Sequence, residues 1–102
     1  MTKDVRLSGP TLKVLRMFMA DVAKARSGAE IHLATGIGSG TLYPLLVRLE
    51  EANWLESKWE NIVPSKEGRP RRRYYAITGI GQRAAREALE PLQWEGSPAW
   101  QA

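Results

Sequence analysis

Apolar residues recur with the spacing of an amphipathic helix in three segments of the first half of the chain. The first segment spans residues 10–22 and starts at Pro10, a residue that the first turn of a helix tolerates. Its apolar positions are Leu12, Val14, Leu15, Phe18, Met19 and Val22. The pattern predicts a first helix with one face on the core.

A second, shorter helix is predicted to run through about Thr35 and to end at Gly36. At its start, Ser27 and Glu30 have the spacing of a capping box, in which each side chain bonds the backbone N–H of the other residue. The apolar residues expected to anchor this helix are Ile31 and Leu33.

The third segment carries four leucines at positions i, i+3, i+4 and i+7, with Ser39 as the predicted N-cap residue. The leucines are Leu42, Leu45, Leu46 and Leu49. Pro44 is close enough to the helix start to cost about one backbone hydrogen bond and a slight bend. Asn53 suits the left-handed conformation that ends a helix. With the leucines inside, the outer side holds Gly40, Thr41, Tyr43, Pro44, Val47 and Arg48.

The second half of the chain changes from helical spacing to alternation. The runs "WLESKWE" (54–60) and "RRYYAIT" (72–78) predict two antiparallel strands, joined by the long turn "NIVPSKEGRP" (61–70). Thr78 is expected to cap a final helix that Pro91 cuts short. The apolar positions of that helix are Ile80, Ala84, Ala88 and Leu89.

The predicted fold is mainly α with a small β-hairpin (α+β): three helices, a two-stranded hairpin and a short C-terminal helix. This order is typical of a winged helix-turn-helix, in which the third helix enters the major groove of DNA and the hairpin turn contacts the backbone or the minor groove. We therefore expect residues 1–90 to form one DNA-binding domain. Residues 91–102 would be a short tail with two tryptophans, a candidate dimer contact.

The net charge of +4 is concentrated in the segment "KEGRPRRR", residues 66–73. Five basic residues and one acidic residue give this segment 5 − 1 = +4, so the other 94 residues are neutral overall. A clustered positive field attracts phosphates, whereas a scattered excess mainly aids solubility. A solvated turn that happens to be basic is the alternative.

The candidate DNA contacts combine the outer side of the third helix with the basic turn. They are Ser39, Gly40, Thr41, Tyr43, Pro44 and Arg48 in the helix, and Lys66, Arg69, Pro70, Arg71 and Arg72 in the turn. Arg69 and Arg71 are the preferred contacts at the tip, because Pro70 stiffens the turn between them. The alternative is that Tyr43 packs over the second helix and that Arg48 pairs with Glu50 or Glu51.

Other chemistry finds little support in the sequence. Cysteine is absent, and His32 is the only histidine, so neither a disulfide nor a metal site nor a catalytic constellation is expected. The glycines of "GIGSG" and "GIGQ" lack the lysine of a phosphate-binding loop, and we expect no cofactor. No apolar run approaches the roughly 20 residues of a membrane span, which favours a cytoplasmic protein. Trp54 and Trp59 are expected to pack in the core or the hairpin.

The motifs "GSGTLYPLLVRLEEANWLES" and "GRPRRRYYAIT" resemble the PadR family of bacterial transcriptional regulators, with a likeness that spans roughly residues 12–89. The resemblance implies a homodimeric repressor that binds a palindromic operator in double-stranded DNA, often released by a small aromatic ligand. It also implies DNA contacts by Thr41, Tyr43 and Arg48 and by the turn from Arg69 to Arg71.

Family members usually form dimers through an extended C-terminal helix, which Pro91, Gly96 and Pro98 are expected to prevent here. Contacts through the first helix, the final helix and the tail from Trp94 to Trp100 would replace it. Trp94 is the candidate ligand-binding residue. The alternative function is a winged-helix protein–protein interaction module without specific DNA readout.

Overall fold

The computed structural model describes the backbone of residues 5–96 and the side chains of residues 5–90. In chain order the elements are α1 (Gly9–Ala20), β1 (Arg26–Ser27), α2 (Gly28–Thr35), α3 (Ser39–Glu51), β2 (Leu55–Trp59), α4 (Pro64–Glu67), β3 (Arg73–Ile77) and α5 (Gly79–Gly96). The strands form one antiparallel sheet in the order β1-β3-β2. The predicted fold class is confirmed, with β1 as a short third strand that no alternation in the sequence marked.

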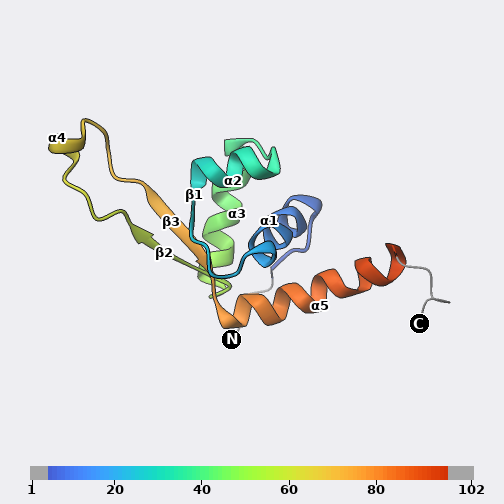
Figure 1. The fold of residues 1–102 in the computed structure, drawn as a ribbon. Coiled ribbons are helices and arrows are strands. Elements are labelled where there is room, and N and C mark those ends of the chain that lie inside the picture. Colours follow the sequence, from blue (N-terminus) through green and yellow to red (C-terminus); the bar gives the residue numbers. More distant parts are fainter. Residues whose placement is uncertain (1–4, 97–102) are drawn as a thin grey trace.

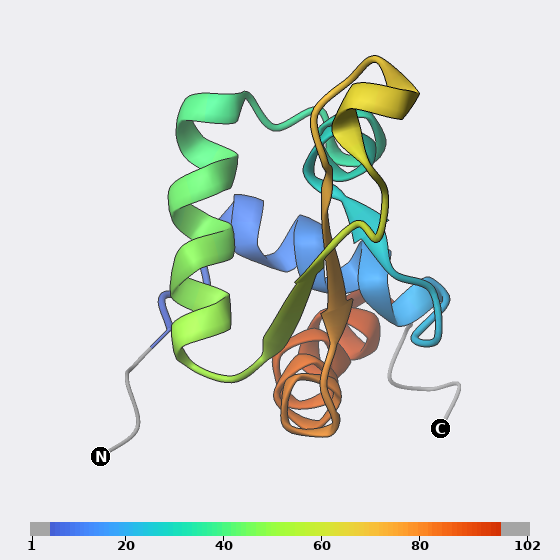
Figure 2. The ribbon, with the colours of Figure 1, turned by 90° about the vertical axis from the view of Figure 1, so that its left-hand side faces the viewer.

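The hairpin of β2 and β3 projects away from the helices (Figure 1). We call this hairpin, with its connecting residues 60–72, the wing. Helix α3 lies beside the wing, while α1 and α5 pack against each other behind them (Figure 2). The predicted long turn contains the one-turn helix α4, which ends at Gly68 in the left-handed conformation with φ 68°.

The leucine stripe of α3 forms the centre of the core, as predicted. Leu42, Leu46 and Leu49 are fully buried, and Leu45 is 2% exposed. They pack with buried residues of every neighbouring element, among them Val14, Leu15 and Phe18 of α1, Ile31 of α2, Leu55 of β2, and Ile77 of β3. Burial of this stripe fixes which side of α3 is left for a partner.

The ends of α2 follow the sequence prediction closely. The Ser27 N–H donates to Glu30 Oε1 at 2.9 Å, and the Glu30 N–H donates to Ser27 Oγ at 3.2 Å, which completes the capping box. The bond from the Ser27 N–H is the main cause that holds the pKa of the Glu30 carboxyl below its ordinary value. Gly36 ends the helix at φ 73°, and Asn53, just after α3, adopts φ 63°.

The N-cap of α3 was predicted wrongly. Gly38 is the cap residue, with extended φ and ψ of −64° and 150°, and Ser39 is already helical, so that no side chain caps this helix. The start of α1 shows the opposite case, because Ser8 accepts a bond from the Thr11 N–H. The backbone at Gly38 has turned before Ser39 is reached, which leaves the serine hydroxyl in the first helical turn.

Three apolar anchors were also predicted wrongly. Leu33 is 81% exposed because it lies two residues, about 200° of helix rotation, from the buried Ile31. Ile80 is 49% exposed because nine residues place it about 180° from Leu89, on the opposite side of α5. Val22 lies beyond the end of α1 and is exposed.

Helix α5 does not stop at Pro91 but continues to Gly96, for 18 residues in all. A proline inside a helix removes one backbone hydrogen bond and crowds the preceding turn. One missing bond does not end a helix whose turns on either side keep theirs. The C-terminal helix is therefore longer than the sequence suggested. The part that the structure describes does not include the side chain of Trp94, nor Pro98 and Trp100.

Candidate nucleic-acid interface

The outward side of α3 carries every helix residue predicted to contact DNA. These residues are Ser39, Gly40, Thr41, Tyr43, Pro44 and Arg48, and all six are exposed. The opposite side of the helix holds the buried leucines, so the two sets share the helix without overlap. The first turn also presents backbone N–H groups, which favour an anion at this end.

Tyr43 is both exposed and packed. Its side chain is 45% exposed, yet its ring lies over the first turn of α2. A β-carbon added at Gly28 would lie 2.7 Å from both Cε1 and the hydroxyl oxygen of Tyr43. The two readings of this tyrosine, packing and contact, are therefore compatible. It was not recognised in the sequence that the Tyr43 ring packs on Gly28, the residue after the Ser27 cap.

Tyr43 and the arginines of the wing line one shallow groove. The groove has a volume of about 230 Å³. Its lining residues are Ser27, Gly28, Ala29, Tyr43, Arg71, Arg72, Arg73 and Tyr75. The fold thus brings the outer side of α3 and three consecutive arginines of the wing to the same face of the protein. The two groups are some thirty positions apart in the chain.

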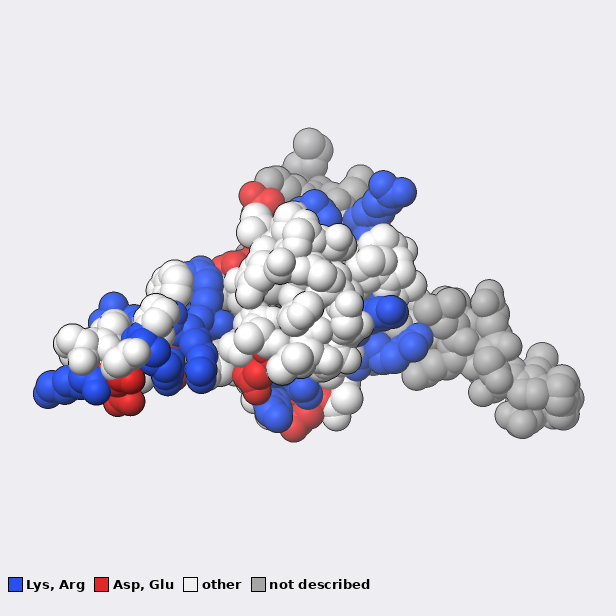
Figure 3. Space-filling view, turned by 90° about the horizontal axis from the view of Figure 1, so that it is seen from above, with Lys and Arg blue, Asp and Glu red and all other residues white. Residues whose placement is uncertain are grey.

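The basic residues of the wing are not equivalent. Lys66, Arg71 and Arg72 are exposed, as is Pro70. Arg71 donates from Nε to the carbonyl oxygen of Ile62 at 3.1 Å, which orients its guanidinium along the wing. Seen from above, Lys and Arg side chains gather over the projecting wing (Figure 3).

Arg69 is tied to the other strand of the wing. Its two terminal nitrogens donate to the two carboxylate oxygens of Glu60, at 2.7 and 2.9 Å. This bond is the main cause that lowers the pKa of Glu60 from 4.5 to about 2. Nothing in the sequence indicated that Arg69 pairs with Glu60, nine residues earlier. Arg69 was instead predicted to be a preferred DNA contact at the tip of the turn.

A second carboxylate joins α3 to the wing. Glu50 accepts bonds from the hydroxyl of Ser57 on β2 and from Arg73 on β3, the latter at 3.3 Å. Arg73 also lies over the ring of Trp59, 5.0 Å from its centre. Trp59 is 62% exposed and so packs in the hairpin rather than in the core. Trp54, by contrast, is partly buried against the core.

Glu50, one of the two glutamates suggested as partners of Arg48, bonds Ser57 and Arg73 of the sheet. Trp59 and Arg73 lie opposite each other in the β2–β3 pairing. The sequence did not show where the turn ends and the second strand begins, so it could not give this register. Sequence reasoning missed Glu50, Glu60 and Arg73 as residues whose bonds link the wing to α3 or link its two sides to each other.

Three further features concern His32, metal binding and membrane insertion. The His32 Nδ1 donates to the carbonyl of Ile37 at 2.6 Å, a bond that fastens the α2–α3 loop. Among the side chains of residues 5–90, no three His, Cys, Asp or Glu gather as a metal site would need. Within residues 5–96 no helix is both long and apolar enough to cross a membrane.

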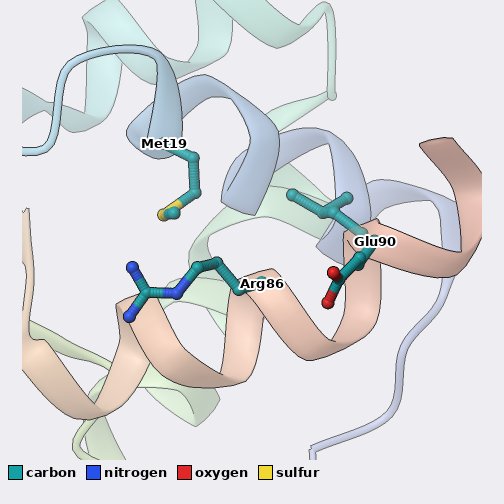
Figure 4. A pocket seen from close by; sticks show the side chains of 4 residues that line it. Met19, Arg86 and Glu90 are labelled. Carbon is teal, nitrogen blue, oxygen red and sulfur yellow. The ribbon is translucent and has the colours of Figure 1, made fainter.

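A hollow of about 200 Å³ lies between α1 and α5, lined by Met19, Arg86, Leu89 and Glu90. Arg86 reaches from α5 toward Met19 of α1 (Figure 4). This hollow is separate from the groove of Tyr43 and shares no residue with it.

Several solved structures share this fold. The protein smu.1704 of Streptococcus mutans superposes with a TM-score of 0.70 at 23% identity, over 94% of this chain and 87% of that one. A PadR family transcriptional regulator from Eggerthella lenta gives a TM-score of 0.62 at 26% identity, over 85% and 76%. BpsR of Bordetella bronchiseptica, whose DNA binding is regulated by 6-hydroxynicotinic acid, gives 0.67 at 19% identity, over 91% and 64%.

No protein of curated function matches the chain in sequence. The model of the PadR-like family of transcriptional regulators matches residues 23–87, which include α2, α3, the wing and half of α5. This match covers 87 − 22 = 65 of the 102 residues, well over half of the chain. The chain therefore belongs to the PadR-like family of transcriptional regulators, which are DNA-binding proteins and not enzymes.

Proposed function

We propose that this chain is a homodimeric repressor that binds a palindromic operator, with the first turns of α3 in the major groove and the wing on the adjacent backbone or minor groove. The observation that carries the proposal is the groove shared by Tyr43 and the arginines Arg71 to Arg73. Because these residues line one face, a single duplex reaches both elements at once.

Each predicted contact has a role that follows from its place. The N–H groups at Ser39 and Gly40 face a phosphate at the helix start, while Thr41 and Tyr43 reach base edges. Arg48, almost two turns further on, contacts the backbone. Pro44 has no backbone N–H and adds an apolar ring to the outer side of the helix. In the wing, the cations that contact phosphates are Lys66, Arg71 and Arg72, with Pro70 against the sugar edge.

The test measures binding to fragments selected from the source genome, by fluorescence anisotropy over a range of salt. Tyr43→Ala and Arg72→Ala are expected to weaken operator binding, and Arg72→Ala is expected to lower the salt slope by ~0.9. Arg83→Ala on α5 removes the same charge from an exposed site outside the groove and serves as the control. Unchanged affinity in both groove variants contradicts the proposal.

The interaction-module alternative makes a different prediction in the same assay. A protein-binding module need not bind random duplex DNA, and any weak binding need not fall with salt. A repressor that neutralises several phosphates loses affinity for random duplex steeply as salt rises. A flat, near-zero response with random and selected DNA alike would favour the alternative.

The homodimer is supported by the length of α5. The C-terminal end of helix α5 extends past α1 (Figure 1), in the manner that the PadR resemblance associates with dimer contacts. Sedimentation equilibrium is expected to give about twice the chain mass of 11.4 kDa. Footprints on the operator should then show two half-sites about 34 Å apart. A monomer that protects a single half-site would contradict this part of the proposal.

A small aromatic effector belongs to the same proposal, and the hollow beside Arg86 supports it. Its volume of about 200 Å³ is below the ~300 Å³ of usual ligand pockets, so a single-ring aromatic compound is the class that fits, with an anionic group on the Arg86 guanidinium and a hydrogen-bond donor facing the Glu90 carboxylate. The probe is 6-hydroxynicotinic acid, the regulator of BpsR. It should release operator DNA from the full chain and not from Arg86→Gln. No release from either protein would exclude this compound.

A further inference from the structure

One carboxylate holds the free end of the wing together. Regular strand pairing ends at Trp59 and Arg73, and one more backbone bond follows, from the Glu60 N–H to the carbonyl of Arg72 at 2.7 Å. Beyond it, the side chain of Glu60 accepts both terminal nitrogens of Arg69 and, on Oε1, the backbone N–H of Arg72 at 3.2 Å. Glu60 thus links both sides of the turn at its base.

These bonds occupy Arg69. Its Nη1 donates to Glu60 and also, at 3.3 Å, to the carbonyl oxygen of Pro70, while its Nη2 donates to the second oxygen of Glu60. The side chain of Arg69 is 32% exposed and that of Glu60 17%, whereas the neighbouring Arg71 and Arg72 are exposed. Three of the five N–H donors of Arg69 are used in these bonds, and the bidentate carboxylate fixes the direction of the guanidinium.

We propose that Arg69 and Glu60 are positioning residues that pre-order the wing, and that the phosphate contacts of the wing are made by Lys66, Arg71 and Arg72. This inference rests on the proposed DNA-binding function and changes the role expected of Arg69. The physical reason is entropic, because the base of the turn, which the Glu60–Arg69 pair holds, would otherwise have to be ordered when DNA binds.

The low pKa of Glu60, about 2, supports the same assignment. The carboxylate stays ionised across the pH range in which proteins bind DNA, so the Arg69 pair persists there. On this proposal the wing has its shape before DNA binds.

The decisive variant is Glu60→Gln, because the two roles of Arg69 predict effects of opposite sign. If Arg69 contacts phosphate, removing Glu60 frees its guanidinium and deletes a negative charge near DNA, so affinity rises. If the pair positions the wing, affinity falls by about three- to tenfold, the cost of ordering one or two more side chains and their loop. We expect the fall.

Glu67→Gln is the matched control for Glu60→Gln. It removes the same charge from an exposed glutamate on the same turn, seven residues on, and it is expected to leave affinity unchanged or to raise it slightly. Arg69→Gln should lower affinity at least as far as Glu60→Gln, because it also removes a positive charge near DNA, and the double variant should lose less than the sum of the two single losses, since both changes break one interaction. Tighter binding by Glu60→Gln, or additive losses in the double variant, would overturn the proposal.

Hydrogen exchange in the absence of DNA tests the clamp separately from DNA binding. The N–H of Arg72 bonds Glu60 Oε1, so its exchange should be faster in Glu60→Gln and in Arg69→Gln than in the native chain and in Glu67→Gln. Equal exchange in all four proteins would overturn the positioning role. If no DNA is bound by any of them but exchange responds as expected, the proposed function fails and the clamp stands.

Discussion

Tyr43 of α3 rests directly on Gly28 of α2, where a β-carbon would come 2.7 Å from its ring and its hydroxyl. The space that a larger residue would need at position 28 is therefore filled by the side chain proposed to read DNA. This contact belongs both to the packing of α2 and to the proposed DNA contact of α3. A mutation can test whether the DNA contact is lost while the packing is kept.

Gly28→Ala is expected to weaken operator binding without unfolding the protein. The tip of the Tyr43 side chain can turn away from a new methyl group, so the free energy of unfolding should change by less than about 1 kcal/mol. The displaced ring loses its place at the groove, and we expect affinity to fall at least about fivefold, the lower limit for one lost base contact. Anisotropy and thermal unfolding measure the two effects.

Gly9→Ala is the matched control for this prediction. Gly9 also lies in the first turn of a helix, and a β-carbon there would meet none of the described atoms within 4 Å. Binding that is equal in Gly28→Ala and Gly9→Ala would show that the position of Tyr43 does not matter for DNA.

Gly81 is the second glycine whose place excludes a side chain, and here the obstacle is backbone. A β-carbon at this position would overlap the carbonyl oxygen of Trp54, which already accepts bonds from the N–H and the hydroxyl of Thr78. Backbone cannot swing aside, so Gly81→Ala should lower the free energy of unfolding by about 1–3 kcal/mol.

Urea denaturation checks this prediction, with Gly79→Ala as the control. A β-carbon at Gly79 would have no described atom within 4 Å, so this variant should be at least as stable as the native chain. An equally stable Gly81→Ala would mean that α5 can shift away from Trp54 at no cost.

The sequence predicted those parts of the fold that repeat over several turns or strands. The stripe of Leu42, Leu45, Leu46 and Leu49 was correct because four residues over two turns define a face without knowledge of its partner. Leu33 was wrong because α2 is only eight residues long, and two apolar residues in it do not define a face.

In the candidate site too, the sequence predicted what a repeating pattern defines and missed contacts that no such pattern marks. Exposure of the α3 contacts followed from burial of the leucines on the other side. The bond between Glu60 and Arg69 joins two residues across an irregular turn, where neither helical nor strand spacing sets which side chains meet. The contact of Tyr43 with Gly28 required the angle between two helices, which no local pattern contains.

The two candidate helix caps, Ser27 and Ser39, provide a paired prediction about stability. Ser27 makes the capping box of α2 and is 4% exposed, so Ser27→Ala should cost about 1 kcal/mol of the free energy of unfolding. Ser39 makes no cap bond, and Ser39→Ala should change stability by less than about 0.5 kcal/mol. Urea denaturation that finds equal losses in the two variants would contradict the assignment of Gly38 as the cap of α3.

The titration of Glu60 gives a prediction about pH. Its pKa in the folded chain is about 2, against an ordinary value of 4.5, so the ionised form is the one that folding favours. The contribution of this carboxylate to the folded wing is complete above about pH 4.5 and is lost as the pH falls toward 2. The main cause is the hydrogen bond from Arg69, and therefore Arg69→Gln should return the pKa toward 4.5.

A carbon-detected NMR titration of the glutamate carboxyls measures this shift directly. We expect the Glu60 resonance of the native chain to begin moving only well below pH 4, and that of Arg69→Gln to begin moving at a higher pH, closer to 4.5. A Glu60 that titrates near 4.5 in the native chain would mean that the Arg69 pair is not formed in solution, and the wing would then have to be ordered by DNA itself.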